Sequence, residues 1–405
     1  MADSQADLQS VEAALEALLA DVSPLPGEQL AIEDAAGRVL ADPVTAMRDV
    51  PPADNSAMDG YTLRAADAGT LLPVSQRITA GSAPEPLAPH SCARIFTGGE
   101  IPPGADCVVM QEEIELHEGG ALIPAGAVPG ENVRRRGRDV AAGCTLLPAG
   151  TRLEGAALGH IAGQGIVSAS VRRRPRIALL TTGDELIEPG QPLAPGQIYN
   201  SNRPMLVRLL TRFGGDVVYT ATLPDDFAMT CQQLAEAAQR ADVVVSCGGV
   251  SVGEEDHVKA ALERLGRLDI WRLAMRPGKP LALGRLPHAD GEARFVGLPG
   301  NPVSSFVGAW LYLRPLIGAL LGCDELAALP RLPARAGFST RTQARRHFMR
   351  VKLEFGAGGI VAHAFADQNS AVLSSCVGAD ALADIPAHSD INEGDRISCL
   401  WLTEG

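Results

Sequence analysis

Lysine is scarce in this sequence. Of the 35 basic residues only three are lysine, and the other 32 are arginine. Two of these lysines, Lys259 and Lys279, lie in or near glycine-rich segments. A compact ammonium binds an anion differently from a guanidinium fork, so we expect Lys279 to contact a phosphate or another oxyanion. For Lys259, a place on the solvated surface is the better interpretation.

Several familiar sites are also missing. The eight cysteines include no Cys-x-x-Cys pair, and the eight histidines show no metal-ligand spacing. This argues against a zinc site and a disulfide framework, and for reduced thiols. No Gly-x-Ser-x-Gly or Walker-type loop occurs. No uninterrupted apolar run is long enough to span a bilayer; residues 307–322 come closest, and Arg314 and Pro315 interrupt them. The N-terminus lacks the charged-then-apolar pattern of a signal peptide, so we expect a cytoplasmic protein.

The bulk composition is that of a soluble enzyme. The net charge of −13 argues against non-specific binding to nucleic acid or to an anionic membrane. The 405 residues suffice for about two to four domains. With 46% hydrophobic and 20% charged residues, the chain has an ordinary globular composition.

The pattern along the chain predicts a multidomain fold that combines α+β and α/β parts. Residues 1–52 and 139–172 are expected to form one discontinuous N-terminal domain. Short β-like runs among glycine and proline predict a small β-rich domain at 53–138, inserted in it. Strand and helix patterns alternate over 173–325, which predicts a doubly wound, mostly parallel sheet. Residues 330–405 alternate apolar and polar side chains and predict a small β barrel or sandwich.

The most informative segment is residues 242–256. It begins as a β-branched strand, continues as a loop that contains Gly248, Gly249 and Gly253, and ends in three acids at 254–256. Open α/β sheets bind ligands where a buried strand ends in such a loop. Glycine lets backbone N–H groups approach an anion, and carboxylates beside an anion suit a hard cation such as Mg²⁺. The segment predicts chemistry on a phosphorylated or oxyanionic ligand with a metal.

Other segments support or leave open this interpretation. Asp184 and Glu185 follow the first strand of the α/β region, on the same predicted sheet edge, where they could hold a metal or supply a base. Residues 297–304 form a tight turn into a helix whose N-terminus could bind an anion, although a rigid connection is an equal alternative. Taken alone, residues 54–60 are best interpreted as an Asx-rich turn. Residues 134–139 are best interpreted as a solvated or domain-junction charge run, unless Arg134 and Asp139 face a ligand.

Together these segments resemble the molybdopterin molybdenumtransferase (MoeA) family, which is related to the gephyrin E domain. The resemblance covers essentially the whole chain, and seven moderately specific motifs in one order make it highly specific. The motifs are DNSAMDGY (54–61), RIFTG (94–98), NVRRRGRD (132–139), TGDEL (182–186), SCGGVSVG (246–253), PGKP (277–280) and LPGNPVS (298–304).

The resemblance implies an elongated N-terminal domain, a central doubly wound α/β domain that binds molybdopterin, and a C-terminal β barrel. It implies insertion of molybdate into adenylylated molybdopterin, with Mg²⁺-dependent release of AMP. It also implies a homodimer, with each site between the α/β domain of one subunit and the small domain of its partner. A molybdopterin adenylyltransferase and apo-molybdoenzymes are expected partners; nucleic acid and membranes are not.

The resemblance also assigns residues to roles. Expected catalytic residues are Asp59, Asp139, Glu185, Asp256 and Lys279. Expected metal ligands are Asp184, Glu185 and Asp256. Expected substrate-binding residues are Thr97, Arg134, Asp184, Asp225, Ser246, Gly248, Gly249, Ser251, Gly253, Arg276, Pro299, Pro302, Ser304, Arg350 and Ser370. Arginine at 272 and 276 departs from the family, in which lysine is frequent there.

Two alternatives stay open. The α/β region alone resembles a molybdopterin adenylyltransferase module, but that module needs neither the N-terminal nor the C-terminal domains. The chain could also be a non-catalytic molybdopterin-binding scaffold. A scaffold could lose its acids and keep its fold, so the presence of Asp59, Asp184, Glu185 and Asp256 favours an enzyme.

Overall fold

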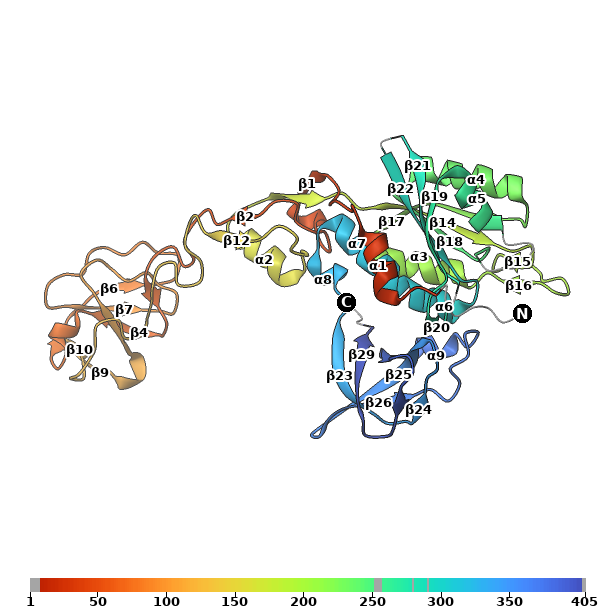
Figure 1. Cartoon of the computed structure of the whole chain (residues 1–405). Coiled ribbons are helices and arrows are strands. Elements are labelled where there is room, and N and C mark those ends of the chain that lie inside the picture. Colours follow the sequence, from red (N-terminus) through yellow and green to blue (C-terminus); the bar gives the residue numbers. More distant parts are fainter. Residues whose placement is uncertain (1–7, 251–256, 279, 290, 403–405) are drawn as a thin grey trace.

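The molecule is elongated. The computed structural model describes residues 8–250, 257–278, 280–289 and 291–402. A small β domain lies at one end, an arm connects it to the rest, and the α/β domain and the C-terminal barrel lie together at the other end (Figure 1). The arm therefore separates two groups of predicted site residues.

The arm is built from two chain segments, one before and one after the small domain. Its strands pair antiparallel: β1 (Gly27–Ala31) with β13 (Ser168–Arg172), and β2 (Val44–Thr45) with β12 (Thr145–Leu147). Helix α2 (Gly155–Gly163) packs beside them through the buried Ile161. The N-terminal helix α1 (Val11–Leu19), capped by Ser10, instead buries Val11, Ala14 and Leu18 in the core of the α/β domain. The predicted domain boundaries themselves stay a prediction.

The small domain consists of short strands, as the many glycines and prolines predict. One sheet has the order β6 (Val74–Ile78), β7 (Cys92–Ile95), β4 (Gly60–Leu63), β8 (Cys107–Met110). A second has the order β5 (Leu71–Leu72), β10 (Gly120–Leu122), β9 (Glu115–His117). The pair β3 (Asn55–Ser56) and β11 (Val133–Arg134) brings together two of the seven motifs, which are far apart in the sequence.

The α/β domain contains a six-stranded sheet in the described part of the chain. Its order is β17 (Asp216–Leu223), β14 (Arg176–Thr182), β18 (Val243–Cys247), β22 (Gly291–Leu298), β21 (Ala282–His288), β19 (Arg267–Trp271). Strands β17, β14, β18 and β22 are parallel, and β21 is antiparallel to both of its neighbours. The predicted mostly parallel sheet is confirmed, with β21 as the exception.

Helices cover both faces of this sheet. Successive strand residues point to opposite faces, so Leu179 lies in one core and Leu180 in the other. The first core includes α1, α3 (Asn202–Arg212), α6 (Pro302–Gly308) and α7 (Arg314–Leu321); the second includes α4 (Phe227–Arg240) and α5 (His257–Leu265). A π-helical turn, Ala309–Leu313, joins α6 to α7. Together these elements form one helical segment of 20 residues, Pro302–Leu321, which by length and composition could cross a membrane. However, 89% of its most apolar 18-residue window is buried inside the protein, as in a core helix.

The C-terminal domain is a closed barrel. Its strands are β23 (Arg331–Ala336), β25 (Arg346–Gly356), β26 (Gly359–Ala364), β27 (Ala381–Ile385) and β29 (Arg396–Trp401). The barrel closes because β25 pairs with both β26 and β27. The C-terminal domain also contains the shorter elements β24 (Thr340–Arg341), α9 (Ser374–Val377) and β28 (Asp390–Ile391). Three other short elements precede the barrel in the chain: β15 (Leu186–Ile187), β16 (Ile198–Tyr199) and α8 (Asp324–Ala327). The alternating pattern thus forms a barrel and not a sandwich.

A two-residue strand joins the barrel to the α/β domain. Strand β20 (Met275–Arg276) leaves the α/β domain and pairs in parallel with the start of β25. Just before this strand, Gln9 forms a parallel bridge with Leu273. The Ala274 N–H donates to the Gln9 carbonyl and the Arg346 N–H donates to the Ala274 carbonyl, both at 2.9 Å, so this segment links the N-terminal residues to the start of β25.

Candidate active site

The predicted loops of the α/β domain meet at one edge of its sheet. Parallel strands carry their C-terminal ends to the same edge, so the loops after β14, β17, β18 and β22 lie together. The Asp225 backbone N–H donates a hydrogen bond of 3.1 Å to Asp184 Oδ1. Asp184 and Glu185 are exposed. The structure therefore brings Asp184, Glu185 and Asp225 to one place, as predicted.

The backbone conformation of the loop after β18 requires glycine. Gly248 and Gly249 have φ angles of +99° and +68°, which other residues rarely adopt. A Cβ atom at Gly248 would lie 2.5 Å from Thr182 Oγ1. The Gly248 N–H donates to the Leu298 carbonyl at 3.0 Å, so the loops after β18 and β22 are held together. Ser246 is fully buried below this loop, and its side chain therefore does not face the open edge as we predicted for a substrate-binding residue.

A cavity of about 260 Å³ lies between the α/β domain and the barrel. It is lined by Arg276, Pro277, Gly278, Pro280, Pro299, Asn301, Ser304, Arg345, Gln368, Asn369 and Ser370. Four predicted substrate-binding residues are in this lining: Arg276, Pro299, Ser304 and Ser370. Among the residues that the structure describes, two guanidinium groups and no carboxylate contribute to this lining. Its charge and size suit a small oxyanion.

Helix α6 adds its N-terminus to this cavity. Asn301 is the N-cap and Pro302 occupies the first turn, where its missing N–H costs no hydrogen bond. Val303 N–H donates to the Ser370 carbonyl at 3.1 Å, which joins the helix to the barrel loop. The positive end of the helix dipole therefore lies at the cavity wall.

Arg350 does not reach this cavity directly. Its side chain is fully buried, and its guanidinium donates to the carbonyls of Gln368 and Asn369 at 3.2 and 3.0 Å. It also donates to Ser375 Oγ at 3.0 Å. These contacts fix the loop that supplies Gln368, Asn369 and Ser370 to the cavity. Arg350 is thus a positioning residue in this structure.

Asp59, Thr97 and Arg134 lie in the small domain at the other end of the molecule, and Asp139 lies beside helix α2 of the arm. Thr97 donates to Asp59 Oδ1 from its backbone N–H and from its hydroxyl, both at 2.8 Å. These hydrogen bonds hold the pKa of Asp59 below its ordinary value. Arg134 is exposed and forms no ion pair within the described residues. Asp139 is also exposed and lines a separate cavity of about 540 Å³ beside His160.

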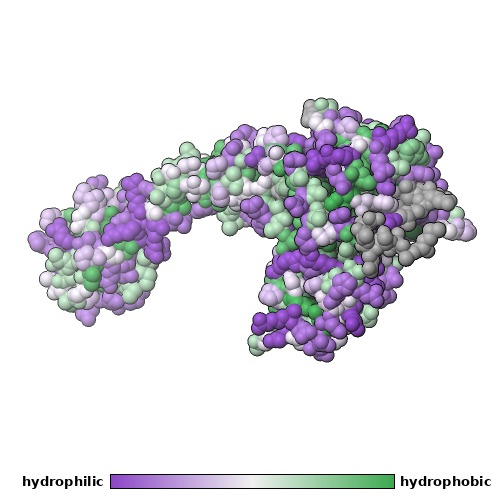
Figure 2. All heavy atoms as spheres, viewed as in Figure 1, coloured by the Kyte–Doolittle hydropathy of each residue, from purple (hydrophilic) through white to green (hydrophobic). Residues whose placement is uncertain are grey.

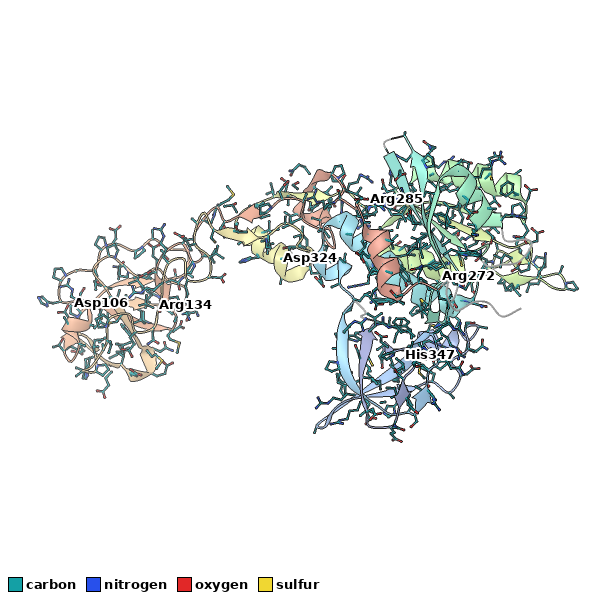
Figure 3. The ribbon with its side chains drawn as sticks, in the orientation of Figure 1. Asp106, Arg134, Arg272, Arg285, Asp324 and His347 are labelled. Carbon is teal, nitrogen blue, oxygen red and sulfur yellow. The ribbon has the colours of Figure 1, made fainter. Side chains whose placement is uncertain are left out.

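One chain does not bring these two groups together. Arg134 lies in the small domain, whereas Arg272 and His347 lie at the opposite end (Figure 3). Hydrophilic side chains gather where the small domain meets the arm (Figure 2). Charged contacts there include Arg135 with Asp54 and Arg136 with Asp49.

Four predicted residues, Ser251, Gly253, Asp256 and Lys279, lie outside the described residues. The predicted metal site thus keeps two described members, Asp184 and Glu185, and within the described part of the chain no group of three metal-binding side chains occurs. Carboxylate oxygens are nevertheless ligands that suit Mg²⁺. Lys259, interpreted above as a surface residue, lies on α5 with its Nζ 3.8 Å from the centre of the Trp271 ring.

Family models match almost the entire chain. The MoeA N-terminal region (domain I and II) matches residues 9–165, a probable molybdopterin binding domain matches 178–319, and the MoeA C-terminal region (domain IV) matches 333–402. A molybdopterin molybdenumtransferase of Haemophilus influenzae is 38% identical over 330 residues, which are 80% of each chain. The chain belongs to the MoeA family.

Other members of the MoeA family support the same assignment. Molybdopterin molybdenumtransferase 2 of Mycobacterium tuberculosis is 36% identical over 369 residues, covering 88% of this chain and 90% of that protein. The crystal structure of a molybdopterin biosynthesis MoeA protein from Pyrococcus horikoshii OT3 superposes with a TM-score of 0.85 at 26% identity. That comparison covers 98% of this chain and 100% of the other.

Sequence reasoning missed several residues of this MoeA-family site. Asn202 Nδ2 donates to the Gly300 carbonyl at 2.6 Å and contacts Cys247 Sγ at 3.2 Å, so it ties together the loops after β18 and β22. Arg345 and Asn301 line the cavity between the α/β domain and the barrel. Asn202 opens a predicted helix and Arg345 lies in an arginine pair, so neither position carried a distinctive signal.

Proposed function

We propose that this chain is a molybdopterin molybdenumtransferase that inserts molybdate into adenylylated molybdopterin with release of AMP. The observation that carries the proposal is the cationic cavity beside Arg276, Arg345 and the α6 N-terminus, one loop away from the acid-bearing sheet edge. Membership of the MoeA family supports it. Molybdate is a small dianion, and adenylylated molybdopterin carries a phosphoanhydride, so one substrate suits each region.

The side chains divide the work as follows. Arg276 and Arg345 balance the charge of the oxyanion, and the Ser304 and Ser370 hydroxyls donate hydrogen bonds to it. Gly278, with a φ of +99°, lets the backbone approach it closely. The Gly248–Gly249 loop holds the phosphates of the pterin nucleotide. The protein thus aligns two anions that otherwise repel each other, and positioning is its main contribution.

Mg²⁺ belongs to the proposal as well. Asp184 and Glu185 are the described residues that would hold it, and their carboxylate oxygens fit a hard cation. When bound, the ion stabilises negative charge on the phosphate oxygens during cleavage of the phosphoanhydride.

We further propose that the active unit is a homodimer. The small domain, whose strands β4 and β7 are labelled in Figure 1 and whose Arg134 is labelled in Figure 3, lies at the far end of the subunit from the α/β domain. Asp59 directly precedes β4, and Thr97 follows β7. These residues would serve catalysis if the small domain of a second subunit reached the α/β domain of the first. We also propose that the protein is cytoplasmic. A molybdopterin adenylyltransferase would supply the adenylylated molybdopterin, and apo-molybdoenzymes would receive the finished cofactor.

The decisive assay measures AMP release from adenylylated molybdopterin by the purified protein. We expect release that requires both molybdate and Mg²⁺. The variant Arg276→Ala should require more molybdate for half-maximal release, because half of the guanidinium charge of the cavity is lost. Tight binding of the nucleotide without any release would instead support the non-catalytic scaffold.

A further inference from the structure

We propose that His347 takes up a proton when an oxyanion binds in the cavity beside Arg276, so that the site binds a dianion together with a proton. This inference rests on the proposed function, because it assumes that the cavity is the oxyanion site. It adds a specificity-determining residue and a pH dependence to that site.

The geometry places His347 directly behind the cavity wall. In the pairing of β20 with β25, His347 is the register partner of Arg276, which lines the cavity. Register partners on neighbouring strands project from the same face of a sheet. Arg345, two residues before His347, lines the cavity as well. Figure 3 shows His347 in the barrel, where the barrel meets the α/β domain.

The imidazole has an unsatisfied nitrogen. The residue is 8% exposed, and its Nε2 atom is buried without a hydrogen-bond partner. Buried polar atoms without a partner are rare in proteins and often mark a functional position. A proton on this nitrogen would add a cationic group beside Arg276 and Arg345, the two guanidinium groups that line the cavity.

The surroundings of His347 are cationic. Burial, and then the guanidinium groups of Arg276, Arg350 and Arg345, lower the pKa of His347 to about 4. The nearest strand partner on β27 is the apolar Ile385. The ring is therefore neutral at pH 7 while the cavity is empty.

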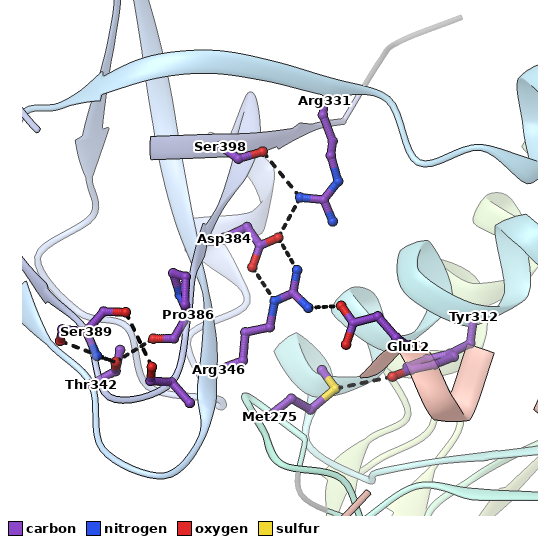
Figure 4. A network of polar contacts seen from close by, with 11 residues as sticks. Glu12, Met275, Tyr312, Arg331, Thr342, Arg346, Asp384, Pro386, Ser389 and Ser398 are labelled. Atoms are coloured by element: carbon purple, nitrogen blue, oxygen red, sulfur yellow. Dashed lines mark hydrogen bonds and ion pairs between the residues drawn. The ribbon is translucent and has the colours of Figure 1, made fainter. Parts of the chain in front are cut away.

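The carboxylates of the junction are paired with other arginines. Arg346 contacts Asp384 of β27 and Glu12 of α1, and Arg331 contacts Asp384 as well (Figure 4). Since Arg346 is adjacent to His347 in the strand, its side chain projects from the opposite face. Within the described ranges, the charged groups that shift the pKa of His347 are the arginines Arg276, Arg350 and Arg345, and none is a carboxylate.

A bound dianion changes this balance. Two negative charges beside Arg276 and Arg345 offset the cationic field that keeps the proton off His347, so the pKa of the ring rises on binding. Linkage is reciprocal: if the anion favours the proton, the proton favours the anion. If the pKa returned to the ordinary value of about 6.5, affinity would rise about tenfold from pH 7.5 to 5.5.

The test is calorimetric titration of molybdate, and separately of sulfate, into the purified full-length protein at pH 5.5 and 7.5. Two buffers with different ionisation enthalpies give the number of protons taken up on binding. We expect the wild type to take up close to one proton at pH 5.5 and to bind both anions more tightly there. Sulfate stays doubly charged over this pH range. Any proton that is taken up when sulfate binds is therefore bound by the protein and not by the anion.

Two variants separate the proton from the structure. His347→Gln keeps a polar side chain of similar size, and we expect it to bind at pH 7.5 but to show no proton uptake and no tightening at pH 5.5. His363→Gln, a change at an exposed barrel histidine paired with Glu354, should behave as the wild type. A melting temperature and circular dichroism spectrum like those of the wild type establish that each variant is folded.

The outcomes are distinguishable. Oxyanion binding without proton uptake, or equal uptake by His347→Gln, overturns the role of His347 and leaves the proposed function intact. Failure of the wild type to bind either anion removes the cavity assignment and this inference with it. In that case the AMP-release assay still decides the catalytic function.

Discussion

Gly248 is a residue at which the backbone conformation constrains this site. Its φ of +99° disfavours any side chain, and a Cβ atom would lie 2.5 Å from Thr182 Oγ1 and 3.0 Å from the Thr182 carbonyl. We expect Gly248→Ala to lower the free energy of unfolding by about 2–3 kcal/mol, through the left-handed backbone and the clash together. AMP release should fall as well if this loop holds the phosphates of the nucleotide, as we propose. Urea unfolding and the release assay measure the two effects.

Gly300 provides the matched control. It lies in the neighbouring loop, and a Cβ atom there would meet only Gly248 Cα at an ordinary 3.8 Å. Gly300→Ala should therefore unfold at nearly the wild-type urea concentration. Equal stability of both variants would show that Gly248 does not constrain the loop as we argue.

At the residue scale, the sequence predicted positions whose chemistry is visible in a motif. Arg276, Ser304 and Ser370 come from three separate segments, and the structure does bring them to one cavity. Arg345 and His347 could not be predicted, because their importance arises from a strand pairing between domains. Arg350 and Ser246 were recognised by type, yet burial decides that their side chains do not face the open site.

The barrel is fixed against α1 by a group of charged side chains. Asp384 of β27 contacts Arg346 and Arg331, and Arg346 also contacts Glu12 of α1 (Figure 4). Burial raises the pKa of Asp384, but the hydrogen bonds and charges of Arg346 and Arg331 outweigh it and hold the pKa below its ordinary value. Its stabilising contribution is therefore present at neutral pH and is lost only in acid below about pH 4.

Removing this carboxylate should be costly. The Asp384 side chain is only 4% exposed, so Asp384→Asn would leave Arg346 partly buried without its main partner. We expect a loss of about 3 kcal/mol in the free energy of unfolding at pH 7, measured by urea unfolding. Asp390→Asn is the control: this residue pairs with Arg341 at 3.9 Å and both are largely exposed, so the loss should stay below about 1 kcal/mol. Similar losses in both variants would contradict a structural role for Asp384.

At the element scale, local patterns predicted the strands and helices but not their partners. The β-branched run at 243–247 and the helical spacing of α3 and α4 are local signals, and these elements are present. The pairing of β20 with β25, and the bridge from Gln9 to Leu273, join residues far apart in the chain. Two-residue strands carry too little periodicity to indicate such a pairing. Helix α1 shows the same point, since its apolar face does not specify which domain covers it.

At the scale of the whole molecule, the elongated shape of one subunit separates the two groups of predicted site residues. In one subunit, Asp59 directly precedes β4, whereas Asp184 and Glu185 lie between β14 and β15. Strand β4 and strands β14 and β15 lie at opposite ends of the molecule, with the arm between them (Figure 1). A motif on each side predicts that both are needed, but no sequence pattern shows whether they would meet within one chain or between two subunits. The geometry of one chain therefore turns the proposed homodimer into a requirement for activity, if both groups act in one site.

This requirement can be tested by mixing two inactive variants. We expect Asp59→Asn and Asp184→Asn each to release little AMP as pure proteins. In a random mixture half of the dimers are heterodimers, and each of these has one site in which both acids are intact. The mixture should therefore recover about a quarter of the wild-type activity, on symmetry alone. Coexpression with two different tags ensures that heterodimers form and can be purified.

The control uses two variants on the same side of the site. Thr97 donates two hydrogen bonds to Asp59, so Thr97→Val and Asp59→Asn both alter the small domain. In their heterodimer every site retains one defect, and we expect no recovery. Recovery in this control, or its absence from the purified Asp59→Asn and Asp184→Asn heterodimer, would mean that the two groups do not share a site. The small domain would then need a role separate from the chemistry at the sheet edge.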